Sequence, residues 1–213
     1  MHLYLVRHGE SEANAAEMVQ GYEPPLTERG REQARFVAER FKTIPVDAIY
    51  ASPMPRAKET AEIINSIIQK PLEFDDVFME TREPSELLGK SDNDPVVRES
   101  RKLRRENFAD LSFRQSDEEN FVDMKERGMR ALKQIESAGV ERLLVVSHGA
   151  LIRILVALMM FGEALEPQEL LRMRRFLFST NTGITWCEFD YPRAPGRWAL
   201  HTWMDHAHLG EVR

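Results

Sequence analysis

Two segments far apart in the chain share one pattern, a short apolar run that ends in His-Gly. Residues 3–9 read LYLVRHG and residues 143–149 read LLVVSHG. An apolar run of this length predicts a buried β-strand, and strands buried on both faces are typical of parallel sheets. Because ligands bind outside the carboxyl ends of such strands, we expect His8 and His148 to lie on the same edge of a sheet.

The rest of the chain alternates between strand and helix patterns. Further strands are predicted at residues 46–51, 72–74, 183–189 and 198–204. Helices are predicted at 27–41, 53–70, 116–139, 150–160 and 167–173, where Thr27 is an N-cap candidate and Ser116 with Glu119 forms a capping-box pattern. This alternation predicts an α/β fold with a doubly wound, mostly parallel sheet flanked by helices.

One stretch does not fit the alternation. Residues 82–115 are polar and are expected to form loops and short helix over the active site. The insert as a whole is placed at about residues 82–138 of a single domain, 1–213. Its basic cluster, at residues 98–105, is interpreted as a solvated helix face.

Composition narrows the class of protein. The chain has 42% hydrophobic residues, enough for a core, and a net charge of −6, which disfavours nucleic-acid partners. The apolar run at 150–162 contains Arg153 and is too short to cross a bilayer. The start of the chain does not resemble a secretory signal, and the single Cys187 suits a reducing compartment. We therefore expect a cytoplasmic protein without a membrane partner; its oligomeric state is left open.

The charged residues near the two histidines suit a phosphate group. Arg7 precedes His8, and Arg56 begins the helix after the strand at 46–51, so both fall near the same sheet edge. Guanidinium groups bind phosphate oxygens bidentately. Neutral imidazole can attack phosphorus, and a second imidazole can stabilise the developing charge. Glu80, after the short strand at 72–74, is the candidate acid for the leaving oxygen.

These residues carry a resemblance to a known family. Residues 5–14, LVRHGESEAN, closely resemble the opening of the histidine phosphatase superfamily, also called the phosphoglycerate mutase-like family. The resemblance continues at residues 20–21, 25–30, 33–34, 52, 56–57, 60–61, 80 and 145–149. It implies a doubly wound α/β fold and a phosphohistidine intermediate, with no metal ion and no cofactor.

The resemblance also assigns roles. It implies that His8 is phosphorylated, that Arg7, Arg56 and His148 form the phosphate pocket, and that Glu80 donates the proton. Asn14 is expected beside the pocket, and the other expected substrate-binding residues are Gln20, Gly21 and Gly149. The sequence after Glu80, TREPSELLG, departs from common members, so Glu83 and Glu86 could serve as the acid in its place.

The expected activity is hydrolysis of a small phosphorylated substrate. A mutase of this family carries paired arginines followed by prolines, whereas Arg104-Arg105 is followed by Glu106-Asn107-Phe108. A protein-phosphohistidine phosphatase and a non-catalytic phosphate-binding module are also compatible with these residues. The C-terminal residues His201, Asp205, His206 and His208 could suggest a metal site, but a closing tail is the favoured interpretation.

Overall fold

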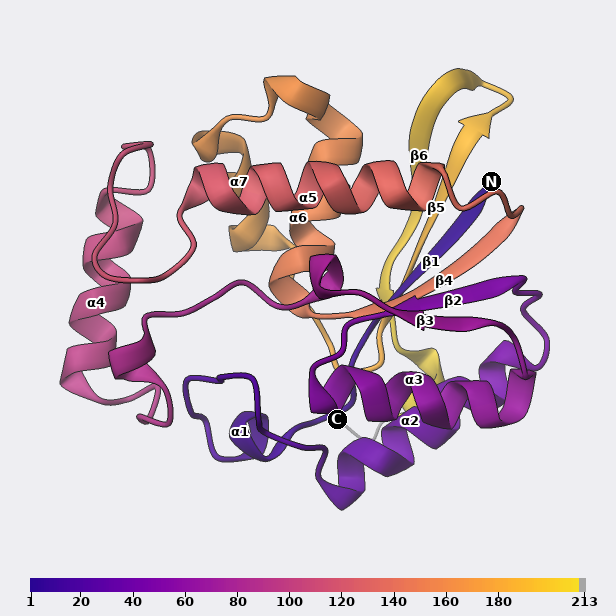
Figure 1. Ribbon diagram of the computed structural model, residues 1–213, viewed down its shortest axis with the longest axis horizontal. Helices are drawn as coiled ribbons and strands as arrows, with labels where there is room; N and C mark the ends of the chain where they lie inside the picture. The colour runs from indigo at the N-terminus through magenta and orange to yellow at the C-terminus, as the bar shows by residue number, and fades with distance from the viewer. Residues whose placement is uncertain (211–213) are drawn as a thin grey trace.

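The computed structural model describes residues 1–210 and is built around one six-stranded sheet (Figure 1). Its strands lie in the order β3-β2-β4-β1-β5-β6. Their bounds are β1 (His2–Arg7), β2 (Ala48–Ala51), β3 (Leu72–Phe74), β4 (Arg142–Ser147), β5 (Ile184–Tyr191) and β6 (Ala194–Asp205). Strands β1 to β4 pair in parallel, while β5 is antiparallel to both of its neighbours. The predicted mostly parallel sheet is confirmed.

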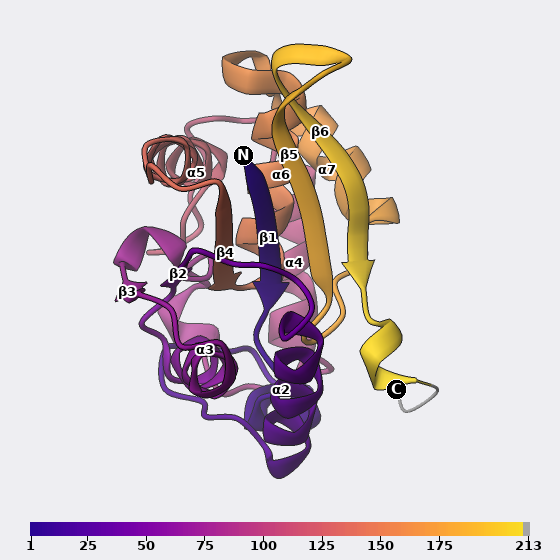
Figure 2. The same ribbon diagram turned by 90° about the vertical axis from the view of Figure 1, so that its right-hand side faces the viewer.

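Helices cover both faces of the sheet, as predicted (Figure 1). The helices α2 (Glu28–Phe41) and α3 (Pro55–Ile68) lie on one face, and α5 (Phe121–Glu136), α6 (Gly149–Phe161) and α7 (Pro167–Phe176) lie on the other. Adjacent residues of β1 alternate between the two apolar layers, since Leu5 packs in the cluster with α5 and α6 and Val6 in the cluster with α2 and α3. Figure 2 shows β5 and β6 beside β1, with β6 at the edge.

The caps of α2 and α3 explain where these helices begin. The Thr27 hydroxyl accepts the N–H of Gly30 at 2.9 Å, which confirms Thr27 as the N-cap of α2. Helix α3 begins at Pro55, two residues later than the sequence pattern predicts, with Met54 as its N-cap. Proline is well accommodated in the first turn because its missing N–H would have no partner within the helix.

The capping box predicted at Ser116 and Glu119 is wrong. Helix α5 begins at Phe121, and Asn120 is its N-cap, with a reciprocal bond between Asp123 and the Asn120 N–H. The reason is that Glu119 has another partner, because its carboxylate forms an ion pair with Arg127 at 2.7 Å. A side chain committed to this buried pair is not available to cap a helix.

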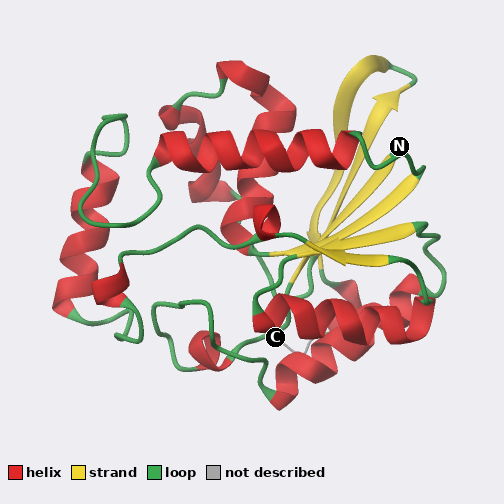
Figure 3. Ribbon diagram, viewed as in Figure 1, coloured by secondary structure: helices red, strands yellow, loops and turns green. Residues whose placement is uncertain are grey.

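The segment 82–115 forms loops and short helix, as expected. It contains the 3₁₀ turn η2 (Ser85–Leu87) and the helix α4 (Pro95–Glu106). In Figure 3, α4 stands apart from the sheet, across from the carboxyl ends of its strands. The interpretation of residues 98–105 as a solvated helix face is wrong for Arg104, because only 20% of its side chain is exposed. Helix α5, which falls in the later part of the insert placed at about residues 82–138, packs against α6 on the sheet. The short elements α1 (Glu12–Ala15), η1 (Asp76–Phe78), η3 (Gly162–Ala164) and η4 (Ala207–Leu209) complete the described chain. Within residues 1–210, no helix is both long and apolar enough to cross a membrane.

Candidate active site

The two histidines meet at the carboxyl edge of the sheet. His8 follows β1 and His148 follows β4, and these strands pair in parallel with Arg7 opposite Ser147. The centroids of the two imidazole rings are 5.1 Å apart. Only 2% of His8 and none of His148 is exposed. Because β1 and β4 end side by side in the sheet, the two imidazole rings lie next to each other.

The hydrogen bond of His8 defines its tautomer. The Nδ1 atom lies 2.6 Å from the carbonyl oxygen of Gly9. Because a carbonyl oxygen can only accept, Nδ1 carries the proton and Nε2 keeps a lone pair. Burial holds the pKa of His8 well below its ordinary 6.5, and the charges of Arg7 and Arg56 lower it further. The ring is therefore neutral at physiological pH, as a nucleophile must be.

His148 is held by Ser52. Its Nε2 atom lies 2.9 Å from the Ser52 hydroxyl oxygen, which accepts the N–H of Met54 at 3.2 Å. The Ser52 proton can then be donated to Nε2, which leaves Nδ1 as the N–H of the ring; no other described residue bonds to Nδ1. Burial lowers the pKa of His148 well below 6.5, and its neighbour His8 adds to the effect. His148 is thus a neutral hydrogen-bond donor beside His8.

Two arginines flank His8. The Arg7 guanidinium donates to the carbonyl of Ser179 at 2.7 Å, and that of Arg56 donates to the carbonyl of Gly21 at 3.0 Å. Only 1% of Arg56 is exposed. Desolvation lowers the pKa of Arg56 to about 10, which still leaves it charged at neutral pH. Within the described part of the chain, the buried Nε atoms of both arginines have no hydrogen-bond partner.

Glu80, which follows η1 in the chain, reaches the same edge. Its carboxylate accepts the N–H of Thr81 at 2.9 Å, and at the start of α6 it accepts those of Ala150 at 3.2 Å and Leu151 at 3.3 Å. These bonds fix the carboxylate beside the pocket that His8 and both arginines line. The same bonds occupy N–H groups of the α6 N-terminus that could otherwise bind an anion directly.

The backbone that carries Glu80 is held by a buried ion pair. Arg127, on α5, donates to the carbonyls of Val77 at 3.3 Å, Met79 at 2.6 Å and Glu80 at 3.4 Å. It also pairs with Glu119 at 2.7 Å, and both side chains are largely buried. One guanidinium thereby fixes three carbonyls of the segment that ends at Glu80. The sequence pattern did not predict this role.

The other expected substrate-binding residues divide into two groups. Asn14 and Gln20 line the pocket. Gly21 and Gly149 do not line it: Gly21 offers its carbonyl to Arg56, and Gly149 packs against Ser179. A Cβ atom on Gly149 would lie only 2.5 Å from the Ser179 hydroxyl oxygen, so a larger residue there would require the Ser179 side chain to move.

The loop between α7 and β5 supplies contacts that were not predicted from the sequence. The Asn181 side-chain amide donates to the His8 carbonyl at 2.9 Å and to Asn14 Oδ1 at 3.4 Å. The Thr182 N–H donates to the Arg7 carbonyl at 3.0 Å. The start of β5 lies at this edge because β5 runs antiparallel to β1. If β5 had been predicted to run antiparallel to β1, the loop before it would have been predicted to lie beside His8.

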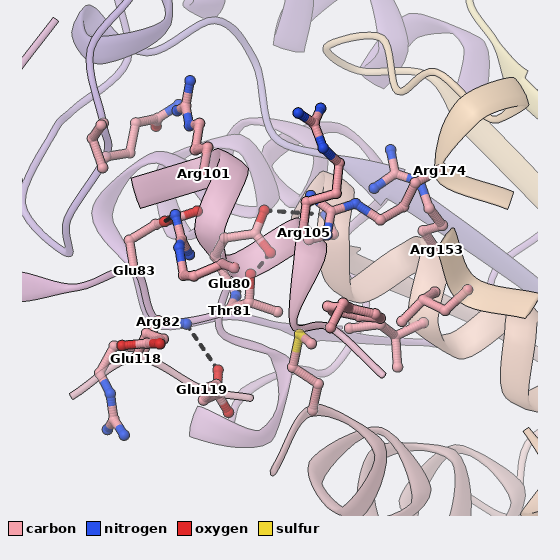
Figure 4. Close-up of a pocket in the computed structure, with 18 of the residues that line it drawn as sticks. Glu80, Thr81, Arg82, Glu83, Arg101, Arg105, Glu118, Glu119, Arg153 and Arg174 are labelled. Atoms are coloured by element: carbon pink, nitrogen blue, oxygen red, sulfur yellow. Dashed lines mark hydrogen bonds and ion pairs between the residues drawn. The ribbon is translucent and has the colours of Figure 1, made fainter. Parts of the chain in front are cut away.

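The two other candidate acids have different partners. Glu83 lines the pocket but forms an ion pair with Arg104 at 2.7 Å. Glu86 accepts from the Ser116 hydroxyl at 2.8 Å and does not line the pocket. Neither carboxylate shares the position of Glu80 between His8 and α6. Figure 4 shows Glu80 and Thr81 at the centre of the pocket wall, with Glu83 to one side.

The C-terminal polar residues are engaged separately. His201 bonds to Glu188 at 3.0 Å, Asp205 pairs with Arg40, and His208 bonds to Thr182 at 3.0 Å. Among residues 1–210, no three His, Cys, Asp or Glu side chains are grouped as metal ligands would be. The segment packs along β5 and α2.

Comparisons with known proteins extend over nearly the whole chain. Residues 3–206 match the family model described as the histidine phosphatase superfamily (branch 1). GpmB of Photorhabdus laumondii, named a probable phosphoglycerate mutase, is 31% identical over 215 residues, which cover 98% of this chain and 95% of that protein. Phosphoglycerate mutase-like protein 4 of Arabidopsis thaliana is 30% identical, over 99% of this chain and 87% of that protein.

Solved structures agree with this assignment. YhfR of Bacillus stearothermophilus superimposes with a TM-score of 0.81 at 28% identity over 98% of both chains. A mutant phosphoserine phosphatase of Entamoeba histolytica in complex with phosphoserine has a TM-score of 0.78 at 25% identity over 98% of both chains. The α-ribazole phosphatase of Shigella flexneri, at 20% identity and a TM-score of 0.79 over 97% of both chains, shows the shared fold. By its family match and by relatives that span its length, this chain belongs to the histidine phosphatase superfamily.

Proposed function

We propose that the protein is a metal-independent phosphomonoesterase that acts on a small phosphorylated substrate through a phosphohistidine at His8. The observation that carries the proposal is the hydrogen bond from His8 Nδ1 to the Gly9 carbonyl, which leaves a neutral ring with Nε2 as the free nucleophile. Arg7 and Arg56 supply fixed positive charge on either side of it. These guanidinium groups can neutralise phosphate oxygens in the role that a metal ion has in other phosphatases.

The reaction proceeds in two displacements. In the first, His8 Nε2 forms a bond to phosphorus as the bond to the leaving oxygen breaks, and Glu80, protonated at this stage, gives that oxygen its proton and becomes a carboxylate. In the second, Glu80 takes a proton from water, which attacks the phosphohistidine and releases phosphate. His148 and the two arginines donate hydrogen bonds to the phosphoryl oxygens, where charge develops in both transition states.

Mutase activity is the principal competing function, because several relatives carry that name. A mutase must retain a phosphorylated intermediate and return the phosphate to a second oxygen. Of the two arginines that could serve such a substrate in the insert, Arg104 is already paired with Glu83. This pairing favours hydrolysis. A non-catalytic phosphate-binding module fits less well, since a pure binding site has no need for an acid placed like Glu80.

The test of the proposal is to trap the covalent intermediate. With a slow phosphomonoester, quenching in base should leave phosphate on His8 as an acid-labile adduct, identified by mass spectrometry of peptides. The matched variants are His8→Gln, which should give no adduct, and His148→Gln, which should still give one slowly because its nucleophile is intact. Phosphate found on a Ser or Asp residue, or none on a protein that turns the substrate over, would overturn the mechanism.

The Arg127 clamp leads to a further prediction. In Arg127→Met combined with Glu119→Gln, no uncompensated charge remains, but the three carbonyls near Glu80 lose their donor. A small displacement of a catalytic group can cost about 10²-fold in rate. We expect a loss on that scale in kcat/KM for an alkyl phosphate, whose oxygen needs the acid, and a much smaller loss for nitrophenyl phosphate. Arg114→Met, which removes a surface pair with Asp123, is the control. Equal losses with both substrates would contradict the positioning role.

A further inference from the structure

The two peptide groups that follow His8 are each held by hydrogen bonds at the carbonyl and at the N–H. In the first, the His8 carbonyl accepts from the Asn181 side chain at 2.9 Å, and the Gly9 N–H donates to the Thr60 hydroxyl at 3.1 Å. In the second, the Gly9 carbonyl lies 2.6 Å from His8 Nδ1. The second peptide therefore carries the carbonyl that defines the tautomer of His8.

The other end of this second peptide is bound by Gln33. The N–H of Glu10 donates to the side-chain oxygen of Gln33 at 2.8 Å. Because a backbone N–H can only donate, the Gln33 atom that faces it is the amide oxygen and not the NH₂ group. Only 8% of Gln33 is exposed, so water has little access to replace this acceptor. The peptide is thus held between two side chains, that of His8 at the carbonyl and that of Gln33 at the N–H.

A close contact between the loop after β1 and the start of α2 brings Gln33 to this peptide. A Cβ atom on Gly9 would lie only 2.4 Å from the Gly30 carbonyl oxygen, and one on Gly30 only 2.0 Å from that of Glu10. The Thr27 N–H also donates to the Glu10 carbonyl at 2.9 Å. Gln33 follows Gly30 by three residues, so it lies on the same side of α2, about one turn further along. This spacing allows its side chain to reach the Glu10 N–H.

The two hydrogen bonds act on one conjugated amide group. Linked hydrogen bonds polarise one another, so an acceptor at the Glu10 N–H makes the Gly9 carbonyl a stronger acceptor for His8 Nδ1. Gly9 has no Cβ atom, and its own side chain therefore does little to fix the direction of this carbonyl. If the carbonyl turned away, the ring proton could move to Nε2 and occupy the lone pair there. The bond to Gln33 opposes that change.

We propose that Gln33 is a positioning residue for the nucleophile: it holds the Glu10 N–H, fixes the Gly9 carbonyl against His8 Nδ1 and so keeps the Nε2 lone pair free. This deepens the proposed function and rests on it, because a free Nε2 lone pair serves catalysis only if His8 attacks phosphorus. Gln33 itself does not line the pocket, so its effect on the reaction is exerted through the peptide group and not through contact with the substrate.

The experiment observes the tautomer of His8 directly, in protein labelled with ¹⁵N at its six histidines. Proton–nitrogen NMR correlations distinguish a protonated ring nitrogen from one with a lone pair, and the His8 signals are those missing from His8→Gln. The variants are Gln33→Met, which has no acceptor, and Gln33→Glu, which keeps one. Val37→Ala is the matched control, since it weakens packing on the same buried face of α2 and leaves the bond to Glu10 in place. Single turnovers with nitrophenyl phosphate and excess enzyme give the rate constant for phosphorylation.

The wild type, Gln33→Glu and Val37→Ala should all show His8 protonated on Nδ1 alone. Gln33→Met should show exchange between both tautomers and a rate constant for phosphorylation that is lower by about 10- to 100-fold. The substrate concentration for half-saturation should change little, because Arg7 and Arg56 still bind the phosphate. Gln33→Glu should recover most of the rate. A merely structural role would lower thermal stability in Gln33→Met and Val37→Ala alike and leave the tautomer unchanged.

Two results would overturn the role of Gln33 and leave the phosphatase function standing: a His8 still protonated on Nδ1 alone in Gln33→Met, or a rate loss there no larger than in Val37→Ala. A shifted tautomer in Gln33→Met, with no phosphohistidine formed by the wild type, would support that role and reject the proposed function. If Gln33→Met does not fold, the wild type decides. A Glu10 amide protected from hydrogen exchange together with an Nδ1 proton on His8 would support the proposal, and a freely exchanging Glu10 amide or an Nε2 proton would overturn it.

Discussion

Replacing His8 with alanine is expected to lower kcat by about 10⁴- to 10⁶-fold while the fold remains intact, in line with the loss of a nucleophile in other enzymes that form covalent intermediates. The reason is geometric as well as chemical. The neutral Nε2 atom lies in a pocket lined by Arg7 and Arg56. Among residues 1–210, no second imidazole offers a free lone pair there, because the Nε2 of His148 is bonded to Ser52 and its Nδ1 carries the ring proton. Steady-state assays with nitrophenyl phosphate over a wide range of enzyme concentration would measure the loss.

Variants of two neighbouring hydrogen-bond donors, Arg56 and His148, provide the comparison for the loss of kcat in His8→Ala. Arg56→Ala and His148→Ala keep the nucleophile but remove one hydrogen-bond donor each, so their turnover should fall by only about 10²–10³-fold. Circular dichroism on all three variants would check that the fold survives, since the residues are buried. A His8→Ala enzyme no worse than the Arg56→Ala enzyme would show that His8 is one donor among several and not the nucleophile.

The sheet and the pair of histidines could be predicted because both depend on local pattern. A buried parallel strand is an apolar run, and two such runs that end in His-Gly meet at one edge whatever lies between them. The edge strand β3, residues 72–74, is predicted to the residue for a different local reason, since a proline and charges bound its short run. Features that a few adjacent residues specify are accessible from the sequence.

The supports of the site could not be predicted because they depend on contacts between distant segments. The sequence alone indicates only that Arg127 is a charged residue on a helix. In the structure it donates hydrogen bonds to carbonyls 47 to 50 residues away. Glu119 fits a helix cap by its spacing from Ser116, and only the fold shows that Arg127 takes its carboxylate. Asn181 lies in a polar loop whose place beside His8 follows from the antiparallel direction of β5.

The surroundings of the basic cluster, residues 98–105, also could not be predicted from the sequence. Its periodicity is that of an exposed helix, and Arg98 and Arg101 do bond at the surface, to Asn93 and Asp92. Whether Arg105 meets solvent or substrate depends on where α4 stands relative to α6 and α7, which no pattern within the insert encodes. Substrate choice in such a protein is therefore set by tertiary placement, while the phosphoryl chemistry is set by motifs.

Replacing Glu80 with glutamine should separate the two halves of the reaction. The amide cannot give a proton to the leaving oxygen or take one from water, and its NH₂ group must face an N–H of Thr81, Ala150 or Leu151, where the carboxylate accepted. An alkyl phosphate needs protonation of its leaving oxygen, whereas nitrophenolate leaves readily. General acid catalysis contributes about 10²–10⁴-fold. We expect phosphorylation of His8 to slow on that scale with an alkyl phosphate and far less with nitrophenyl phosphate, measured by rapid quenching.

Hydrolysis of the phosphohistidine, the second half of the reaction, provides an independent test of the role of Glu80. Without a base for water, the phosphohistidine formed from nitrophenyl phosphate should persist, so that a burst of nitrophenol precedes a slow steady state. Glu83→Gln and Glu86→Gln are the matched variants, and neither should show the burst, because Glu83 is paired with Arg104 and Glu86 does not line the pocket. If the burst and the dependence on leaving group appeared in Glu83→Gln and were absent in Glu80→Gln, the acid would be Glu83, and the carboxylate at the start of α6 would serve only to cap the helix.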